Sequence, residues 1–82
     1  MITVQVKLFA TLRGRAGPPG LGIGQPFPVE LPKDATAAHL IEHLGLPAEE
    51  VKLLFVNGLI RTPDDVLADG DELGIFPPVG GG

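Results

Sequence analysis

The 82-residue chain contains no cysteine, serine, tyrosine or tryptophan. Without cysteine it can form no disulfide framework, no thiolate nucleophile and no Cys-based zinc or iron–sulfur site. The joint absence of cysteine and serine also leaves no side-chain nucleophile in a recognisable setting. The sequence therefore argues against catalysis by the side chains of this chain.

Basic residues are scarce, and long apolar runs are absent. Six Lys and Arg against ten Asp and Glu give a formal net charge of -4 at pH 7, and the cations are scattered. Phosphate binding needs clustered cations, and a membrane span needs about 18 consecutive apolar residues. The start, Met1–Val6, also lacks the features of a signal peptide. We therefore expect a cytoplasmic protein with neither nucleic acid nor membrane as a partner.

Candidate metal and acid–base residues have simpler interpretations. His39 and His43 are four residues apart and could share a metal with Glu42, but no third strong ligand is indicated, and we predict no metal site. The acidic pairs Glu49-Glu50 and Asp64-Asp65 fall in predicted turns. We interpret both pairs as solvated turn residues, because a general acid and base would need a cleft with a desolvated member.

The length allows one domain. At this size about 60% of the unfolded surface is buried on folding, so a deep catalytic cavity would consume much of the core. Glycine and proline are concentrated in residues 17–28 and 77–82, which leaves an ordinary globular composition elsewhere. We predict a domain over residues 1–76 and an extended, flexible tail over residues 77–82, a size that favours a binding or carrier role.

Alternation of apolar and polar residues predicts most of the strands. Residues 2–9 and 27–31 alternate in this way, and Pro26 and Pro28 mark the second strand as an edge strand. Residues 52–56 form a third strand, and Asn57-Gly58 is the dipeptide of a type I′ hairpin. The predicted sheet is completed by a short limb at 59–61 and a last strand at 72–76.

One amphipathic helix is predicted after the second strand. Asp34 or Thr36 can cap it, and Gly45 can end it in a left-handed conformation. Its apolar positions have the spacing of a single helical face: Ala37, Leu40, Ile41 and Leu44. The order β-β-α-β-β-β predicts an α+β domain of two layers. Inserting the last strand beside the first is the arrangement that best buries its Leu73 and Ile75. That arrangement is a ubiquitin-like β-grasp: a mixed sheet with one main helix on one face.

Two phenylalanines are predicted on the face of the sheet that the helix does not cover. Phe9 falls out of phase with the core residues of the first strand, and Phe76 falls out of phase with those of the last. If these strands are parallel neighbours, both rings lie at one end of that face, and Ile60 can join them. Adjacent exposed aromatics predict a partner interface. The alternative is a small satellite cluster covered by the long loop.

The tail combines a stiff segment with a slender end. Pro77 and Pro78 fix φ at about −65° and remove two backbone donors, so the strand must end there. Residues 77–82 span roughly 20 Å when extended, and glycine passes close to surrounding walls without steric conflict. The α-carboxylate is an anionic oxygen nucleophile at pH 7 that can attack an activated phosphate to give an acyl-adenylate. The alternative is an inert, frayed tail.

Several segments together resemble the small subunit of molybdopterin synthase, a ubiquitin-like sulfur carrier. The resemblance covers nearly the whole chain and is carried by Val6–Arg13, Thr36–Leu44, Val56–Gly58, Leu67–Glu72 and above all Phe76–Gly82. It implies that an adenylating enzyme similar to ubiquitin-activating enzymes uses ATP to activate the terminal glycine. It further implies that a sulfur donor converts this glycine to a thiocarboxylate, and that the tail enters the large synthase subunit to give dithiolene sulfur to a pterin precursor. No permanently bound cofactor is implied.

Carried onto this sequence, the resemblance assigns a role to each matching residue. Gly82 bears the acyl-adenylate and then the thiocarboxylate, and Gly81 gives access to it. The predicted partner contacts are Phe9, Ile60, Phe76, Pro77, Pro78, Val79 and Gly80.

Other functions remain open at this level. Val79–Gly82 also resembles the thiamine-pathway sulfur carrier, and carriers for cysteine or tRNA thiolation share the fold. The paired prolines and the longer loop after the first strand favour the molybdenum route. Two further alternatives are a ubiquitin-like modifier joined to lysines and a β-grasp interaction module with an inert tail.

Overall fold

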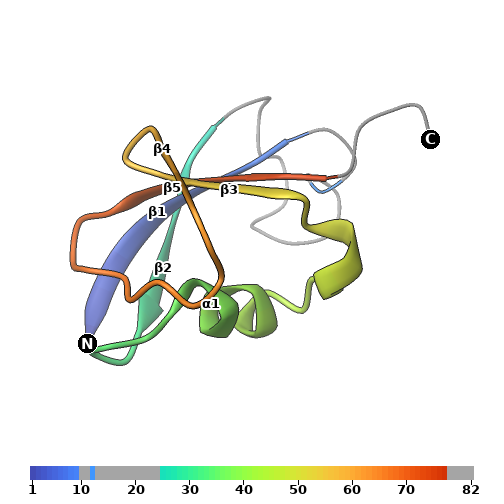
Figure 1. Cartoon of the computed structure of the whole chain (residues 1–82). Helices are drawn as coiled ribbons and strands as arrows, with labels where there is room; N and C mark the ends of the chain where they lie inside the picture. The colour runs from blue at the N-terminus through green and yellow to red at the C-terminus, as the bar shows by residue number, and fades with distance from the viewer. Residues whose placement is uncertain (10–11, 13–24, 78–82) are drawn as a thin grey trace.

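The computed structural model describes residues 1–9, 12 and 25–77 (Figure 1). These residues form a five-stranded sheet with one α-helix. The elements are β1 (Ile2–Leu8), β2 (Phe27–Leu31), α1 (Ala37–His43), the 3-10 turn η2 (Ala48–Glu50), β3 (Leu53–Val56), β4 (Leu59–Arg61) and β5 (Glu72–Phe76). Each predicted element is present, with bounds shifted by a residue or two.

The strands lie in the order β2-β1-β5-β3-β4, so the last strand of the chain is the central strand of the sheet. β5 runs parallel to β1 and antiparallel to β3, whereas β1 pairs with β2 and β3 pairs with β4 in antiparallel fashion. The predicted insertion of the last strand beside the first is confirmed, as is the edge position of β2. The topology is the ubiquitin-like β-grasp that the sequence predicts.

The helix begins at a reciprocal cap. Thr36 is the N-cap residue, and its Oγ1 accepts a hydrogen bond from the backbone N–H of His39 at 3.3 Å. The Thr36 N–H donates in return to Nδ1 of His39 at 3.0 Å. His39 thus takes the position that Glu or Gln usually holds in a capping box. Gly45, with φ of 74°, follows the helix in the predicted left-handed conformation.

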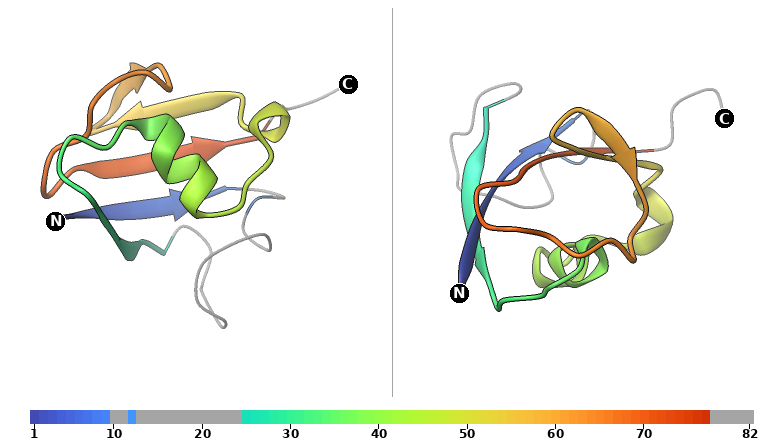
Figure 2. Two further views of the ribbon diagram at one scale, coloured as in Figure 1. Left: turned by 90° about the horizontal axis from the view of Figure 1, so that it is seen from below. Right: turned by 60° about the vertical axis from the view of Figure 1, so that its left-hand side comes forward.

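A single apolar core fills the space between α1 and the sheet, and the left-hand view of Figure 2 shows α1 lying across that face. The fully buried side chains include Val4, Val6, Leu8, Leu40, Leu73 and Ile75. These are the alternating strand residues and the helix face that the sequence assigned to the core. We call the opposite side of the sheet the open face; no helix of the described residues packs on it.

Two turns hold β5 in register with its neighbours. Thr3 N–H donates to Oδ1 of Asp69 and Thr3 O accepts from Gly70 N–H, both at 2.8 Å. Asn57 Nδ2 donates to Oδ1 of Asp71 at 3.0 Å, which ties the β3–β4 hairpin to the start of β5. Asn57 and Gly58 have φ of 53° and 83°, as the predicted type I′ turn requires. The Asp69–Asp71 turn therefore has a structural role.

No helix in the described part of the chain is both long and apolar enough to cross a membrane.

We expect replacement of a core leucine to destabilise the domain far more than replacement of an exposed one. Leu40 is 0% exposed, so Leu40→Ala should lower the free energy of unfolding by about 2–5 kcal/mol through lost burial and a residual cavity. Leu59 is 59% exposed, and Leu59→Ala should change it by no more than about 0.5 kcal/mol. Urea unfolding of both variants makes the comparison, and similar losses would contradict the assignment of the core.

Candidate functional site

Phe9 and Phe76 lie side by side on the open face. β1 and β5 are parallel neighbours, and Phe9 N–H donates to the carbonyl of Ile75 at 3.2 Å, which brings the two strand ends together. The rings stack with their centroids 4.1 Å apart and their planes 4° from parallel. Both side chains are half-buried. The predicted placement of the two phenylalanines is confirmed.

A third ring, that of Phe55, belongs to the same group, although the sequence did not single it out. Its centroid lies 5.3 Å from that of Phe76, with an interplanar angle of 71°. On β3, Phe55 lies opposite Ile60 of β4 on one side and opposite Gly74 of β5 on the other. Ile60 is 67% exposed, so it extends this apolar surface to the edge of the sheet. We call Phe9, Phe55, Phe76 and Ile60 the aromatic cluster.

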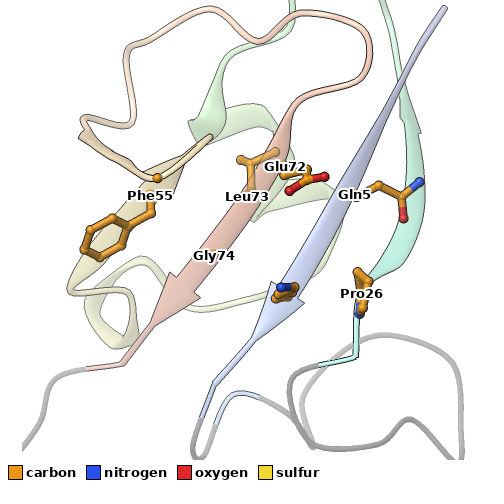
Figure 3. Close-up of a pocket in the computed structure, with 8 residues that line it drawn as sticks. Gln5, Pro26, Phe55, Glu72, Leu73 and Gly74 are labelled. Atoms are coloured by element: carbon orange, nitrogen blue, oxygen red, sulfur yellow. The ribbon is translucent and has the colours of Figure 1, made fainter.

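Gly74 leaves room for the stacked rings. A Cβ at this position would lie 3.3 Å from Cε2 of Phe9 and 3.5 Å from Cε1 of Phe76. Beside Gly74 the open face carries a hollow of about 320 Å³, with Phe55 on one side and Gln5 and Pro26 on the other (Figure 3). Its remaining lining residues are Lys7, Gly58, Glu72 and Leu73. The cluster therefore adjoins a hollow whose lining includes apolar residues and one residue of each charge, Lys7 and Glu72.

The end of β5 continues directly toward the predicted tail. Lys52 N–H donates to the carbonyl of Phe76 at 2.8 Å, and Pro77 is buried. Pro77 is the last described residue of the chain, and its predicted contact with a partner stays a prediction. Residues 78–82, which include Pro78, Val79, Gly80, Gly81 and Gly82, lie outside the described residues, so their roles stay predictions.

The predicted alternative of a loop folded over the rings cannot be placed in the structure, because it concerns the loop predicted over residues 14–25, of which only Gln25 is described. Of the two helix histidines, His39 takes part in the helix cap. Nδ1 of His39 accepts the hydrogen bond from Thr36 in the capping box. Within residues 1–9, 12 and 25–77, no group of three or more His, Asp or Glu side chains is placed to hold a metal ion.

Known proteins are similar to this chain over nearly its whole length. The model of the ThiS family matches residues 6–82. The chain is 37% identical over 81 residues to the molybdopterin synthase sulfur carrier subunit of Escherichia coli, a match that covers 96% of this chain and 99% of that protein.

Two solved structures are similar over nearly their full lengths. A molybdopterin converting factor, subunit 1, from Pyrococcus furiosus shares 31% identity with a TM-score of 0.72, over 96% of this chain and 100% of that one. Small archaeal modifier protein 1 from Haloferax volcanii shares 26% identity with a TM-score of 0.73, over 96% and 100% of the two chains. The family match spans the aromatic cluster and the glycine-rich end together, and the chain belongs to the ThiS family.

Proposed function

We propose that this chain is the sulfur carrier subunit of a molybdopterin synthase. The observation that carries the proposal is its 37% identity, over 96% of its length, to a sulfur carrier subunit of that enzyme. The geometry of the site supports it independently. The aromatic cluster ends at Phe76, and the glycine-rich segment begins only a few residues later. A surface for partner contact and a reactive end therefore adjoin each other.

The proposed chemistry takes place on Gly82. An oxygen of its carboxylate attacks the α-phosphorus of ATP, pyrophosphate leaves, and an acyl-adenylate forms. Hydrosulfide released by a donor protein then attacks the acyl carbon, AMP leaves, and the S–H proton passes to water. The product is a thiocarboxylate. Its sulfur is a stronger nucleophile than the oxygen of the original carboxylate. The adenylating enzyme supplies the ATP site, so this chain needs no permanently bound cofactor.

The aromatic cluster provides the second part of the proposal. We assign it to contact with the large synthase subunit, because a few residues, aromatic ones among them, contribute most of the binding energy of an interface. Ile60, at 67% exposed, has the most to bury. Docking through the cluster would direct residues 78–82 into the active site of the large subunit, where the thiocarboxylate meets the pterin precursor. We place the complex in the cytoplasm, where ATP is available for activation.

Intact-mass analysis tests the chemistry directly. After incubation with the cognate adenylating enzyme, ATP and a sulfur donor, we expect the mass of the chain to rise by the exchange of one oxygen for sulfur, with fragmentation locating the change at Gly82. The variant that lacks Gly81 and Gly82 is the control, because it should keep its fold yet show no exchange. An unchanged mass in the full chain would contradict the proposal.

Binding to the large subunit tests the aromatic cluster. We expect Ile60→Ala to raise the Kd by about ten-fold, the effect of truncating a residue central to an interface, with little loss of stability. Phe76→Ala should weaken binding at least as much. Leu59→Ala is the matched control, because Leu59 adjoins Ile60 on β4 and is similarly exposed, at 59%, but points to the other side of the sheet. Isothermal titration calorimetry gives the three Kd values.

Urea unfolding of the same variants separates binding from stability. A loss of about 3–5 kcal/mol in Phe76→Ala, as for an aromatic core residue, together with an unchanged Kd would show that the cluster only packs the domain. An equal effect of Ile60→Ala and Leu59→Ala on binding would also contradict the assigned surface.

A second candidate function is protein modification. The similarity to small archaeal modifier protein 1, at 26% identity over 96% of the chain, favours it as a further use of the same carboxyl end. Conjugates isolated from cells would then carry an isopeptide bond between Gly82 and a lysine. Their presence would add this function, and their absence alongside thiocarboxylate formation would restrict the chain to sulfur transfer.

A further inference from the structure

The outer edge of β2 has an unusual run of prolines. Pro26, Pro28 and Pro32 are spaced by two and four residues, so all three have the same parity along the strand. The residues between them, Phe27, Val29 and Leu31, are buried in the core. Among the residues that the structure describes, β2 is the first strand in the sheet order and β1 is its one partner (Figure 2). The direction in which its backbone groups point therefore decides whether another strand could pair there.

The hydrogen bonds of β1 fix that direction. Gln5 N–H donates to the carbonyl of Asp71 at 2.9 Å, on the β5 side of the strand. Thr3 likewise directs its N–H to Asp69 and its carbonyl to Gly70 on that side. In the antiparallel register, Gln5 lies opposite Pro28. Because a residue in a strand directs its N–H and C=O to the same side, this is a non-hydrogen-bonded pair. The backbone nitrogen of Pro28 therefore points away from β1, toward the open edge.

The same parity applies to the neighbouring positions. Glu30 lies opposite Thr3, so its N–H also points outward, and its side chain is charged and exposed. Pro26 and Pro32 flank the strand and, like Pro28 and Glu30, occupy even-numbered positions. Any residue other than proline at these positions would direct a further backbone N–H outward. Among residues 26, 28, 30 and 32, only Glu30 has an N–H at all. An incoming strand would find carbonyl acceptors but almost no donors.

The other edge of the sheet, formed by β4, is limited as a site for strand addition by its length. Asn57 N–H donates to the carbonyl of Glu72, so the odd-numbered residues of β3 direct their backbone groups to β5. Ile60, opposite Phe55, therefore directs its own groups outward from β4. However, β4 has only three residues, which is too short to pair extensively. β2 has five residues and would be the better template for strand addition if its donors were present.

We propose that Pro26, Pro28 and Pro32 close the β2 edge to strand addition and so prevent this domain from pairing with a second copy of itself. Edge strands with free donors and acceptors pair readily with other chains, and proline and charge on the edge are means of preventing it. A monomeric domain leaves both its open face and the β4 edge accessible. The inference concerns residues 26–32 alone and does not depend on the proposed function.

Restoring the donors tests the proposal. The double variant Pro26→Thr/Pro28→Thr returns two outward N–H groups and introduces residues that favour strands. We expect the unaltered chain to remain a monomer of 8.5 kDa across a concentration series in size-exclusion chromatography with light scattering. The double variant should approach twice that mass as concentration rises. Pro63→Thr is the matched control, because Pro63 is exposed and lies in the turn after β4, away from the β2 edge, and this variant should stay monomeric.

Amide hydrogen exchange then shows whether the edge is the contact. The new N–H of residue 28 should exchange quickly in the dilute monomer and become protected in the associated form. Circular dichroism and thermal unfolding verify that each variant is folded. The proposal is overturned if the folded double variant stays monomeric, if it associates while the residue 28 amide exchanges freely, or if Pro63→Thr associates equally.

Discussion

The central position of β5 is the constraint on which the rest of this structure depends. The last strand of the chain lies between β1 and β3, where Leu73 and Ile75 are almost fully buried. Because β5 runs parallel to β1, the C-terminal ends of the two strands meet at one end of the sheet. That meeting stacks the rings of Phe9 and Phe76 with their centroids 4.1 Å apart. The same strand pairing therefore buries the core residues of β5 and brings the two phenylalanines together.

The two faces and two edges of the sheet have separate roles in this account. One face holds the core under α1, and the other carries the aromatic cluster with Gly74 beneath the stacked rings. The β2 edge presents prolines, and the β4 edge presents Ile60. A domain of 82 residues has little interior to spare for a catalytic pocket. In the proposed function the reactive group lies at the end of the chain, and partner proteins supply the pockets.

Much of this arrangement could be predicted from the sequence, because it follows from local periodicity. Alternation located β1, β2 and β5, and the burial of Leu73 and Ile75 predicted where β5 inserts. Phe55 was missed because it lies in a continuous apolar run whose facing is ambiguous; the register across the Asn57-Gly58 turn, which pairs it with Ile60, could have found it. The reciprocal cap was not predicted because His39 stands where the capping-box pattern has Glu or Gln, and the burial of Pro77 is not encoded by any local pattern.

The most direct test of the central claim is to follow sulfur from this chain into product. The chain would be thiocarboxylated with a sulfur isotope label, mixed with the large synthase subunit and the pterin precursor, and both protein and pterin examined by mass spectrometry. The account predicts that the label leaves Gly82 and appears in the dithiolene of the pterin, while the chain returns to an unmodified carboxylate. Retention of the label on the chain, with product formed from another sulfur source, would contradict it.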